Sequence, residues 1–240
     1  MKLAALGSVI EVDLSGTGLD HDAVRTAWSR CLVPDDTPCD HDVLMPSTSS
    51  MSSLTQEITR AFITTQIGHL LMFHAGAVCN PDTGASLVYI APGGTGKTTL
   101  TRLLGTRYGY LTDETVAVEP GTWRILPYPK PLSFRVPGKA GKDEISPDEL
   151  GLVRAHPEPH VAAILLLDRS EQVVNASVTP QSLMDAVTFI CGQSSSLSAL
   201  GHPLHTLADL YHDLQSISKV TYTEAADLMP MVNQWIGSRP

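Results

Sequence analysis

Residues 87–104, LVYIAPGGTGKTTLTRLL, decide the fold of this chain. A short apolar run, Leu87–Ile90, favours a β-strand and leads into a glycine-rich turn. Leucines at positions 100, 103 and 104 then follow at helical spacing. Strand, glycine-rich loop, Gly-Lys-Thr and helix together make the pattern of a P-loop, which holds the phosphates of a nucleotide. The segment therefore predicts an α/β fold with a nucleoside triphosphate site.

Each part of this pattern has a physical reason. The glycines let backbone amides converge on a phosphate, and a helix that begins near Lys97 presents unpaired N–H groups and a positive dipole end. Lys97 adds a point charge for the β- and γ-phosphates, and the Thr98 hydroxyl is placed to ligate Mg²⁺. Ala91 stands where the strict motif has its first glycine, a position that tolerates alanine at negative φ. The predicted cofactors are ATP and Mg²⁺, held by Gly93, Gly94, Thr95, Gly96, Lys97, Thr98 and Thr99.

Composition limits the class of protein. The chain has 240 residues, 42% of them hydrophobic, enough to bury the core of one domain with a small annex. A net charge of −9 argues against nucleic acid or an anionic membrane as a partner. No apolar run approaches the ~18 residues of a membrane span. The four cysteines lack C-x-x-C spacing, so we expect thiols in a cytoplasmic protein.

The N-terminal part differs from the rest. We expect residues 1–53 to form a small β-rich annex and linker, and residues 54–240 to form one P-loop kinase-like domain. Residues 33–53 are rich in Pro, Asp and Ser, which is typical of a loop. Its acidic cluster can be read as a metal site or as a solvated loop, and we favour the solvated loop. The cluster consists of Asp35, Asp36, Asp40, His41 and Asp42.

Local signals predict the elements around the P-loop. Ser53 and Gln56 form a capping-box pattern, so a helix is expected from there through Leu71. A strand over 72–78 is followed by the turn residues Asn80–Gly84, so it should form an antiparallel hairpin with the strand that enters the loop. Val161–Asp168 is continuously apolar, as central strands are. Further helices are expected near 181–191, 203–217 and 224–236, and a loop over 136–144.

A P-loop needs a carboxylate near Mg²⁺, usually at the end of a neighbouring strand. Two places qualify: the pair Asp113-Glu114, which ends the strand after the P-loop helix, and Asp168, which ends a later apolar run. We favour the pair, because one carboxylate can hold the metal while the other takes a proton from a substrate hydroxyl. His74 lies in the middle of the strand over 72–78, one hairpin away from the loop, and a lone histidine in a strand is usually a core residue.

These features taken together resemble one family. A histidine followed by small residues, a turn, a strand, the P-loop helix and an acidic strand end occur here in the order found in the HPr kinase/phosphorylase family. These are bacterial kinases whose ATP site is similar to that of phosphoenolpyruvate carboxykinase. The match covers residues 71–118, with weaker support from the Pro-Lys-Pro stretch up to Arg135. It implies a P-loop core of this type, with a mixed sheet flanked by helices.

The resemblance also implies roles for individual residues. The active-site histidine of the family falls on His74, and its tandem aspartates fall on Asp113 and Glu114. This implies metal binding by Thr98 and Asp113, and general-base catalysis by Glu114, which is one methylene longer than the family's aspartate. The glycine-rich signature used for HPr docking is absent. The chain therefore looks more like the compact HPr-kinase-related proteins of peptide-tailoring systems, including kinases of lasso precursor peptides.

A kinase also benefits from a cation that meets the transferring phosphoryl group. Arg135, at the end of a proline-rich stretch, is the favoured candidate, ahead of Lys130; Lys139 and Lys142 are read as solvated. The predicted function is Mg-ATP-dependent transfer of a phosphoryl group to a Ser or Thr hydroxyl of a peptide or small protein. The alternatives are a non-catalytic ATP-binding regulator and a small-molecule kinase. The oligomeric state stays open, and a homo-oligomer is compatible with the sequence.

Overall fold

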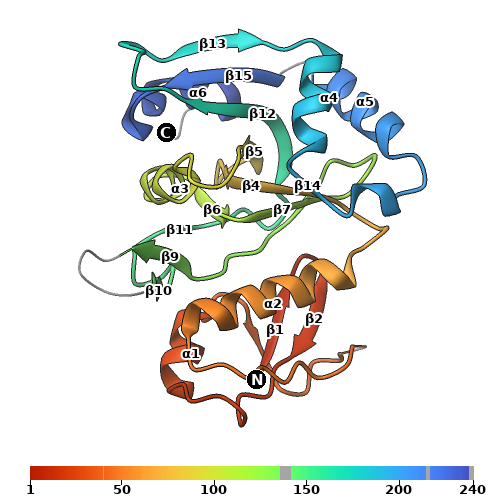
Figure 1. Ribbon diagram of the computed structural model, residues 1–240, viewed down its shortest axis with the longest axis vertical. Coiled ribbons are helices and arrows are strands. Elements are labelled where there is room, and N and C mark those ends of the chain that lie inside the picture. The colour runs from red at the N-terminus through yellow and green to blue at the C-terminus, as the bar shows by residue number, and fades with distance from the viewer. Residues whose placement is uncertain (40, 136–141, 215–216, 238–240) are drawn as a thin grey trace. The chain divides into compact units, whose positions relative to one another are not determined.

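A computed structural model of the protein describes residues 1–39, 41–135, 142–214 and 217–237, and the side chain of Arg135 also lies outside the description. The chain divides into two compact units. Unit 1 comprises Met1–Ile67 and Tyr128–Gly151, and unit 2 comprises Gly68–Pro127 and Leu152–Pro240 (Figure 1). The expected division after residue 53 falls inside unit 1, because the helix at this point packs on strands from both segments of that unit.

Unit 1 contains a small antiparallel sheet in the order β2-β1-β3, two helices and a separate β-hairpin. The Asp20 carboxylate accepts from the amides of Asp22 and Ala23 and so begins the first helix. The rings of Trp28 and Phe62 contact that of Tyr128 in the core. The elements are β1 (Lys2–Ala5), β2 (Ser8–Glu11), α1 (His21–Ala27), β3 (Leu32–Val33), α2 (Met51–Thr65), β9 (Leu132–Arg135) and β10 (Lys142–Ile145).

Two expectations in unit 1 were wrong in detail. Helix α2 begins one turn early, because Ser50 rather than Ser53 caps it by accepting from the Ser53 amide. It ends at Thr65 rather than Leu71, because Gly68 takes a φ of +81°, which is incompatible with a continuing helix. The expected loop over 136–144 lies outside the described residues as far as 141, and residues 142–144 belong to strand β10, which pairs with β9.

Unit 2 is built on a mixed sheet flanked by helices, as expected, in the order β11-β6-β4-β5-β12-β15-β13. β4 and β5 form the expected antiparallel hairpin, and β12 runs parallel to β5 and to β15. Strands β7 and β14 also pair with β4, and β8 pairs with β7. The strands are β4 (Leu71–Cys79), β5 (Ala85–Ile90), β6 (Gly109–Thr112), β7 (Thr115–Val118), β8 (Ile125–Leu126), β11 (Val153–Arg154), β12 (His160–Arg169), β13 (Ser177–Pro180), β14 (Ser194–Ser195) and β15 (Ile217–Tyr222).

Helices cover both faces of this sheet (Figure 1). One face carries α3, η2 and α6, with Leu100, Leu104 and Leu228 in a common core with β5 and β12. The other face carries α4 and α5, with Ile190 and Leu210 in a second core. The expected helix over 224–236 is divided, because Pro230 lacks a backbone donor. The helices are α3 (Lys97–Gly105), α4 (Leu183–Cys191), η1 (Leu197–Ala199), α5 (Pro203–Leu214), η2 (Ala225–Met231) and α6 (Asn233–Ile236).

Strands β5, β6, β12 and β15 all run in one direction, so their carboxyl ends share one edge of the sheet. The glycine-rich loop, Asp113 and Asp168 all follow or end strands at this edge. Within the described residues, none of the helices combines the length and apolar character needed to cross a bilayer.

Candidate functional site

The glycine-rich loop, residues 91–96, joins β5 to α3. Gly94 and Gly96 have φ values of +83° and +101°, a conformation that other residues rarely adopt. A Cβ at Gly93 or Gly94 would meet no described atom within 4 Å, so the loop presents bare backbone at its surface. No described side chain caps α3, whose first turn contains Lys97, Thr98 and Thr99. The first amides of the helix are thus free to bind an anion.

Lys97 is 6% exposed and folds back over the loop. Its Nζ donates to the carbonyls of Ala91, at 2.5 Å, and Pro92, at 3.0 Å. Burial lowers the pKa of Lys97 to about 8, and the carboxylates of Asp113 and Glu114 oppose that shift. The ammonium group is therefore still mostly charged at neutral pH, within reach of the loop on which a phosphate would sit.

Thr98 and Asp113, the two predicted metal ligands, come together at the start of α3. The Thr98 hydroxyl donates to Asp113 Oδ2 at 2.8 Å, and the Tyr110 hydroxyl donates to Oδ1 at 3.4 Å. Asp113 is 5% exposed. A hydroxyl and a carboxylate are oxygen ligands of the kind that suit Mg²⁺, which also keeps waters and substrate phosphates as ligands. Among the described residues no group of three His, Cys, Asp or Glu side chains could hold a metal; Asp40 of the acidic loop in unit 1 lies outside them.

His74 and Glu114 lie beside this pair. The Ala75 amide donates to the Glu114 carbonyl at 3.1 Å, and the His74 amide donates to Gln193 O at 2.7 Å, so both backbones are fixed. Burial lowers the pKa of His74, and the charge of Lys97 lowers it further, whereas Glu114 and Asp113 act in the opposite direction. The imidazole is therefore neutral at neutral pH and can accept a proton.

The small residues after His74 make room for α3. A Cβ at Gly76 would lie 2.2 Å from a ring carbon of Tyr89 and 2.8 Å from Thr101 Oγ1. Tyr89 and Thr101 join β5 to α3 through a hydrogen bond of 2.5 Å between their hydroxyls. Only a glycine on β4 allows this close approach.

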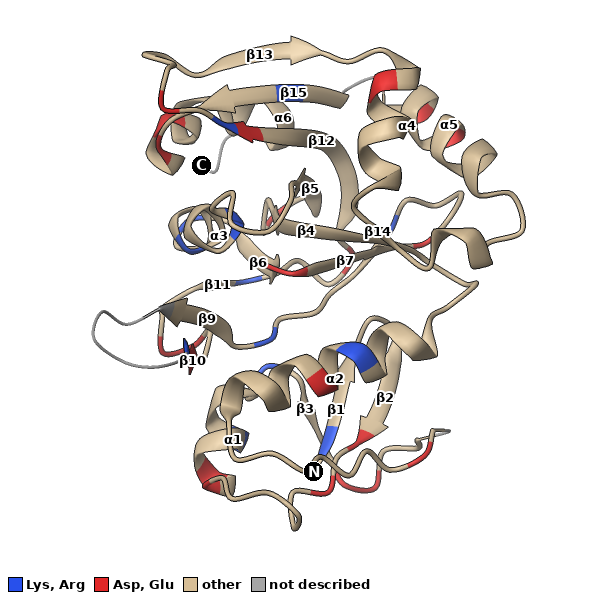
Figure 2. Cartoon of the chain, viewed as in Figure 1, with Lys and Arg blue, Asp and Glu red and all other residues tan. Residues whose placement is uncertain are grey.

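Asp168, the alternative metal ligand, has different neighbours. It pairs with Lys219 Nζ at 2.8 Å, and both side chains are 45% exposed. Figure 2 shows acidic and basic positions adjacent at the carboxyl end of β12, where Asp168 and Arg169 end the strand. The Thr98 hydroxyl thus contacts Asp113, while a cation already neutralises Asp168.

The predicted cations are not all described. Arg135 ends β9 in unit 1, with its side chain outside the described residues, and Lys139 also lies outside them. Lys130, in unit 1, is 1% exposed and donates to Pro131 O at 2.9 Å. Lys142 is exposed on β10.

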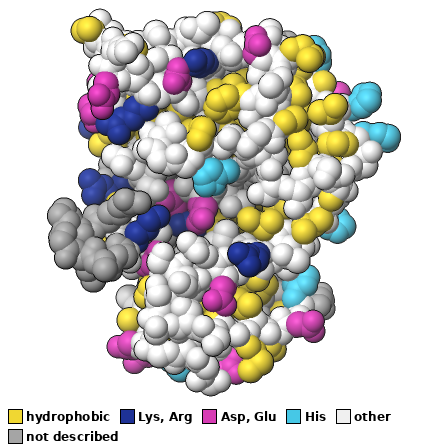
Figure 3. Space-filling model, in the orientation of Figure 1, with side chains coloured by type: hydrophobic (Ala, Val, Ile, Leu, Met, Phe, Trp, Pro, Cys, Tyr) yellow, Lys and Arg dark blue, Asp and Glu magenta, His cyan; other side chains and the backbone are white. Residues whose placement is uncertain are grey.

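Sequence reasoning missed a cavity of about 620 Å³ beside the glycine-rich loop. Residues 92–95 line it together with the carboxyl end of β12, Lys219 of β15, and Gln181, Asp185 and Phe189 at and within α4. Only the charged Asp168-Arg169 end of an apolar run could have indicated it. Figure 3 shows hydrophobic side chains gathered over α4 and α5, where Met184 and Leu204 are exposed.

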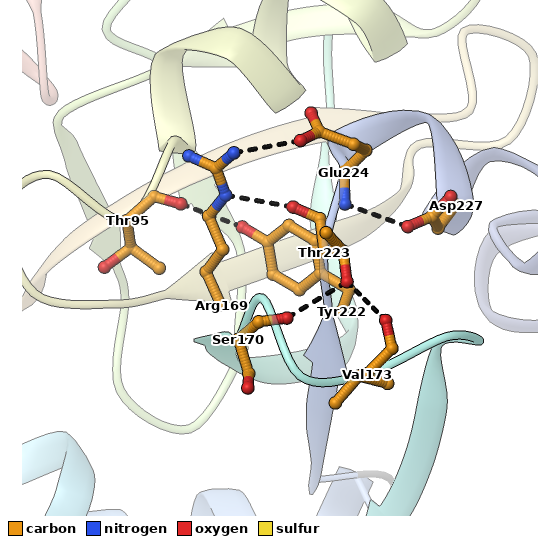
Figure 4. Close-up of polar contacts among 8 residues, drawn as sticks. All are labelled: Thr95, Arg169, Ser170, Val173, Tyr222, Thr223, Glu224 and Asp227. Carbon is orange, nitrogen blue, oxygen red and sulfur yellow. Dashed lines mark hydrogen bonds and ion pairs between the residues drawn. The ribbon is translucent and has the colours of Figure 1, made fainter.

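Strand β15 also holds the loop. The Tyr222 hydroxyl donates to Thr95 O at 3.0 Å (Figure 4). Arg169, which lines the cavity, donates to Thr223 O at 2.9 Å and pairs with Glu224 at 3.1 Å. Thr223 Oγ1 in turn donates to the Ser170 and Val173 carbonyls. The segments that follow β12 and β15 are thus tied to each other and to the loop.

No protein-family model and no curated protein matches the chain. Among solved structures it is similar to the Hpr(Ser) kinase/phosphatase from Coxiella burnetii, at 12% identity over 69% of this chain and 93% of that chain, with a TM-score of 0.38. This similarity is too remote to support a conclusion on activity. Any such conclusion therefore has to rest on the geometry of the site.

Proposed function

We propose that this protein is a Mg²⁺- and ATP-dependent kinase, which transfers the γ-phosphoryl group to a Ser or Thr hydroxyl of a peptide or small protein. The observation that carries the proposal is the 2.8 Å contact between Thr98 and Asp113 at the start of α3. It joins an oxygen pair suited to Mg²⁺ with an uncapped helix N-terminus and the Lys97 ammonium. Few sites other than nucleoside triphosphate sites need an oxygen pair, a helix N-terminus and an ammonium group together.

In the proposed reaction, backbone amides of residues 93–98 bind the phosphates and Lys97 neutralises the β- and γ-phosphates. Thr98 and Asp113 would hold Mg²⁺, which offsets the charge that develops on the phosphate oxygens. Fixing these groups before the reaction begins is the main protein contribution to phosphoryl transfer.

On the acceptor side, Glu114 and the neutral His74 are the proposed proton acceptors. The acceptor oxygen forms a bond to the γ-phosphorus, the bond from that phosphorus to the β–γ bridging oxygen breaks, and ADP leaves. The hydroxyl proton passes to Glu114 or His74. For Arg135 we retain the proposed role of stabilising the transferring group, on the strength of the sequence alone.

The test is incubation with γ-labelled ATP, Mg²⁺ and a peptide library containing Ser and Thr. We expect labelled peptide with the wild type and none with Lys97→Ala, whose circular dichroism spectrum should match that of the wild type. Label that appears only in small molecules would indicate a small-molecule kinase, and ATP binding without any product would indicate a regulator. Equal activity of Lys97→Ala and the wild type would overturn the proposal.

A further inference from the structure

The described residues that line the cavity beside the glycine-rich loop all belong to unit 2. Its volume of about 620 Å³ is in the range of small-molecule sites, which enclose about 300–1,000 Å³. Its lining includes the exposed backbone of residues 92–95 and, from a distant part of the chain, Gln181, Asp185 and Phe189. A ligand that places phosphates on the loop would therefore extend directly into this cavity.

The sheet topology puts the cavity where ligands of α/β proteins gather. The chain leaves β5 for α3 on one face of the sheet, and it leaves β12 by way of β13 for α4 on the other face. Neighbouring parallel strands whose connections diverge in this way open a crevice at their carboxyl ends, and ligands bind there. Residues 92–95 and Asp168 line the cavity from the two sides of that crevice.

The reaction geometry decides which part of the substrates belongs there. His74, Asp113 and Glu114 come from β4 and from the β6–β7 turn, on the opposite side of β5 from β12. None of these three is among the described residues that line the cavity. In an in-line transfer the attacking and leaving oxygens lie on opposite sides of the phosphoryl group. The acceptor thus approaches on the side of Glu114, and the nucleoside extends on the side of the cavity.

Three of the residues that line the cavity, Gln181, Asp185 and Phe189, are arranged to recognise a base. The Gln181 backbone is fixed at both ends, because its amide donates to Ile217 O at 3.0 Å and its carbonyl accepts from Tyr211 Oη at 2.8 Å. Asp185 Oδ2 accepts from the Ser182 hydroxyl at 2.6 Å, which holds the carboxylate in place. Phe189 is four residues further along α4 and so lies on the same face of the helix as Asp185.

We infer that this cavity is the nucleoside pocket of the site, with the base stacked on Phe189 and an exocyclic amino group of the base donating to Asp185. The inference rests on the proposed function, which it deepens by naming the ligand as a triphosphate of an amino-bearing base. Gln181 Nε2 donates to the carbonyls of Thr179 and Pro180, so its side-chain oxygen is the atom of that amide that can accept from a ligand. A carboxylate and an amide oxygen together favour a base edge that offers N–H groups.

The experiment is titration calorimetry of the full chain with Mg²⁺ and three ligands: ATP, purine riboside triphosphate, which lacks the amino group, and inorganic tripolyphosphate. We expect the wild type to bind ATP about tenfold more tightly than purine riboside triphosphate, in keeping with one hydrogen bond to a charged group. Asp185→Ala should remove that difference. Asp209→Ala, which removes an exposed carboxylate from the neighbouring helix α5, should preserve it.

The stacking contact is tested separately with Phe189→Leu, which keeps an apolar side chain against the core. It should weaken both nucleotides about tenfold, in line with the loss of base–aromatic stacking, and leave tripolyphosphate unchanged. Equal affinities of the wild type for ATP and tripolyphosphate would overturn the nucleoside pocket alone. Unchanged ATP affinity in both Asp185→Ala and Phe189→Leu would overturn it as well. A wild type that binds neither ATP nor tripolyphosphate would instead overturn the proposed function and the inference with it.

Discussion

Asp113 and Asp168 end two strands of the same sheet at the same edge, and each precedes a second charged residue. Their surroundings nevertheless differ in kind. Two hydroxyl groups donate to Asp113, which is almost fully buried. An ammonium group pairs with Asp168, whose side chain is about half exposed. A carboxylate beside a second oxygen ligand suits a metal ion, whereas the lysine paired with Asp168 would repel one.

An acidic residue at the end of a strand is therefore not by itself a metal site. The two aspartates differ in the element that supplies their partner. Helix α3 brings Thr98 to Asp113, and strand β15 brings Lys219 to Asp168. The site is thus divided by β5 into a side proposed for chemistry and a side proposed for holding the rest of the nucleotide.

The largest expected effect separates the two aspartates directly. Asp113→Ala should lower kcat for phosphoryl transfer by about 10²–10³-fold, the cost of losing one preorganised electrostatic group. Asp168→Ala, which removes a carboxylate of equal size from the other side, should lower it by less than about tenfold, since an exposed ion pair contributes little. Steady-state rates at saturating Mg²⁺ measure both, and equal losses would show that the division is wrong.

The next effect concerns His74 on the chemistry side. Its pKa lies below the ordinary value of 6.5, chiefly because it is buried. The imidazole can accept a proton only when neutral, so kcat/KM should stay level as pH falls to 6.5 and decline below it. His74→Gln should lower the rate by about 10²-fold, as expected for removal of a general base, and should abolish this acid limb. An unchanged profile in the variant would remove His74 from the reaction.

A smaller effect should follow the charge of Lys97. Burial lowers its pKa to about 8, so the ammonium group loses its proton as pH rises through that value. The dissociation constant for ATP should be constant between pH 6.5 and 7.5 and rise by up to about tenfold for each unit above pH 8. Lys97→Arg, which keeps its charge to higher pH, should bind ATP with a flat profile over the same range. Calorimetry in a pH series measures both.

The smallest effect belongs to the binding side, at Tyr222. Tyr222→Phe removes the hydrogen bond to Thr95 O, and one such bond is worth about 0.5–1.5 kcal/mol, so ATP affinity should fall by about two- to tenfold. Tyr108→Phe loses a comparable hydrogen bond, to Asn233, and should leave the affinity unchanged. If both variants lose the same affinity, the effect reflects general loosening of the unit and not the loop.

Local signals in the sequence were enough for the centre of unit 2. The turn residues Asn80–Gly84 predicted the β4–β5 hairpin, and the apolar run from Val161 predicted β12. Helix α3 and the meeting of Thr98 with Asp113 also follow from short-range patterns, because the glycine-rich loop, its helix and the next strand are consecutive.

Features that depend on distant segments could not be predicted. The cavity draws its lining from residues 92–95, 166–171, 181–189 and 219, and no periodicity in the sequence relates these segments. Strand β13 has four exposed residues at the edge of the sheet and so lacks the apolar alternation of a buried strand. Contacts between α2 and β10 place the β9–β10 hairpin in unit 1 with the N-terminal segment, and such long-range contacts cannot be read from the sequence.

Gly76 has a consequence for the engineering of this site. The missing side chain lets the Tyr89 ring and Thr101 of α3 lie directly against β4. A single added methyl group at that position would act as a spacer, because the ring it would strike is buried and bonded to Thr101. Every charged group of the site would still be present, yet Tyr89 or α3, the helix that carries Thr98, would have to shift. A residue without a side chain thus constrains the position of the charged ones.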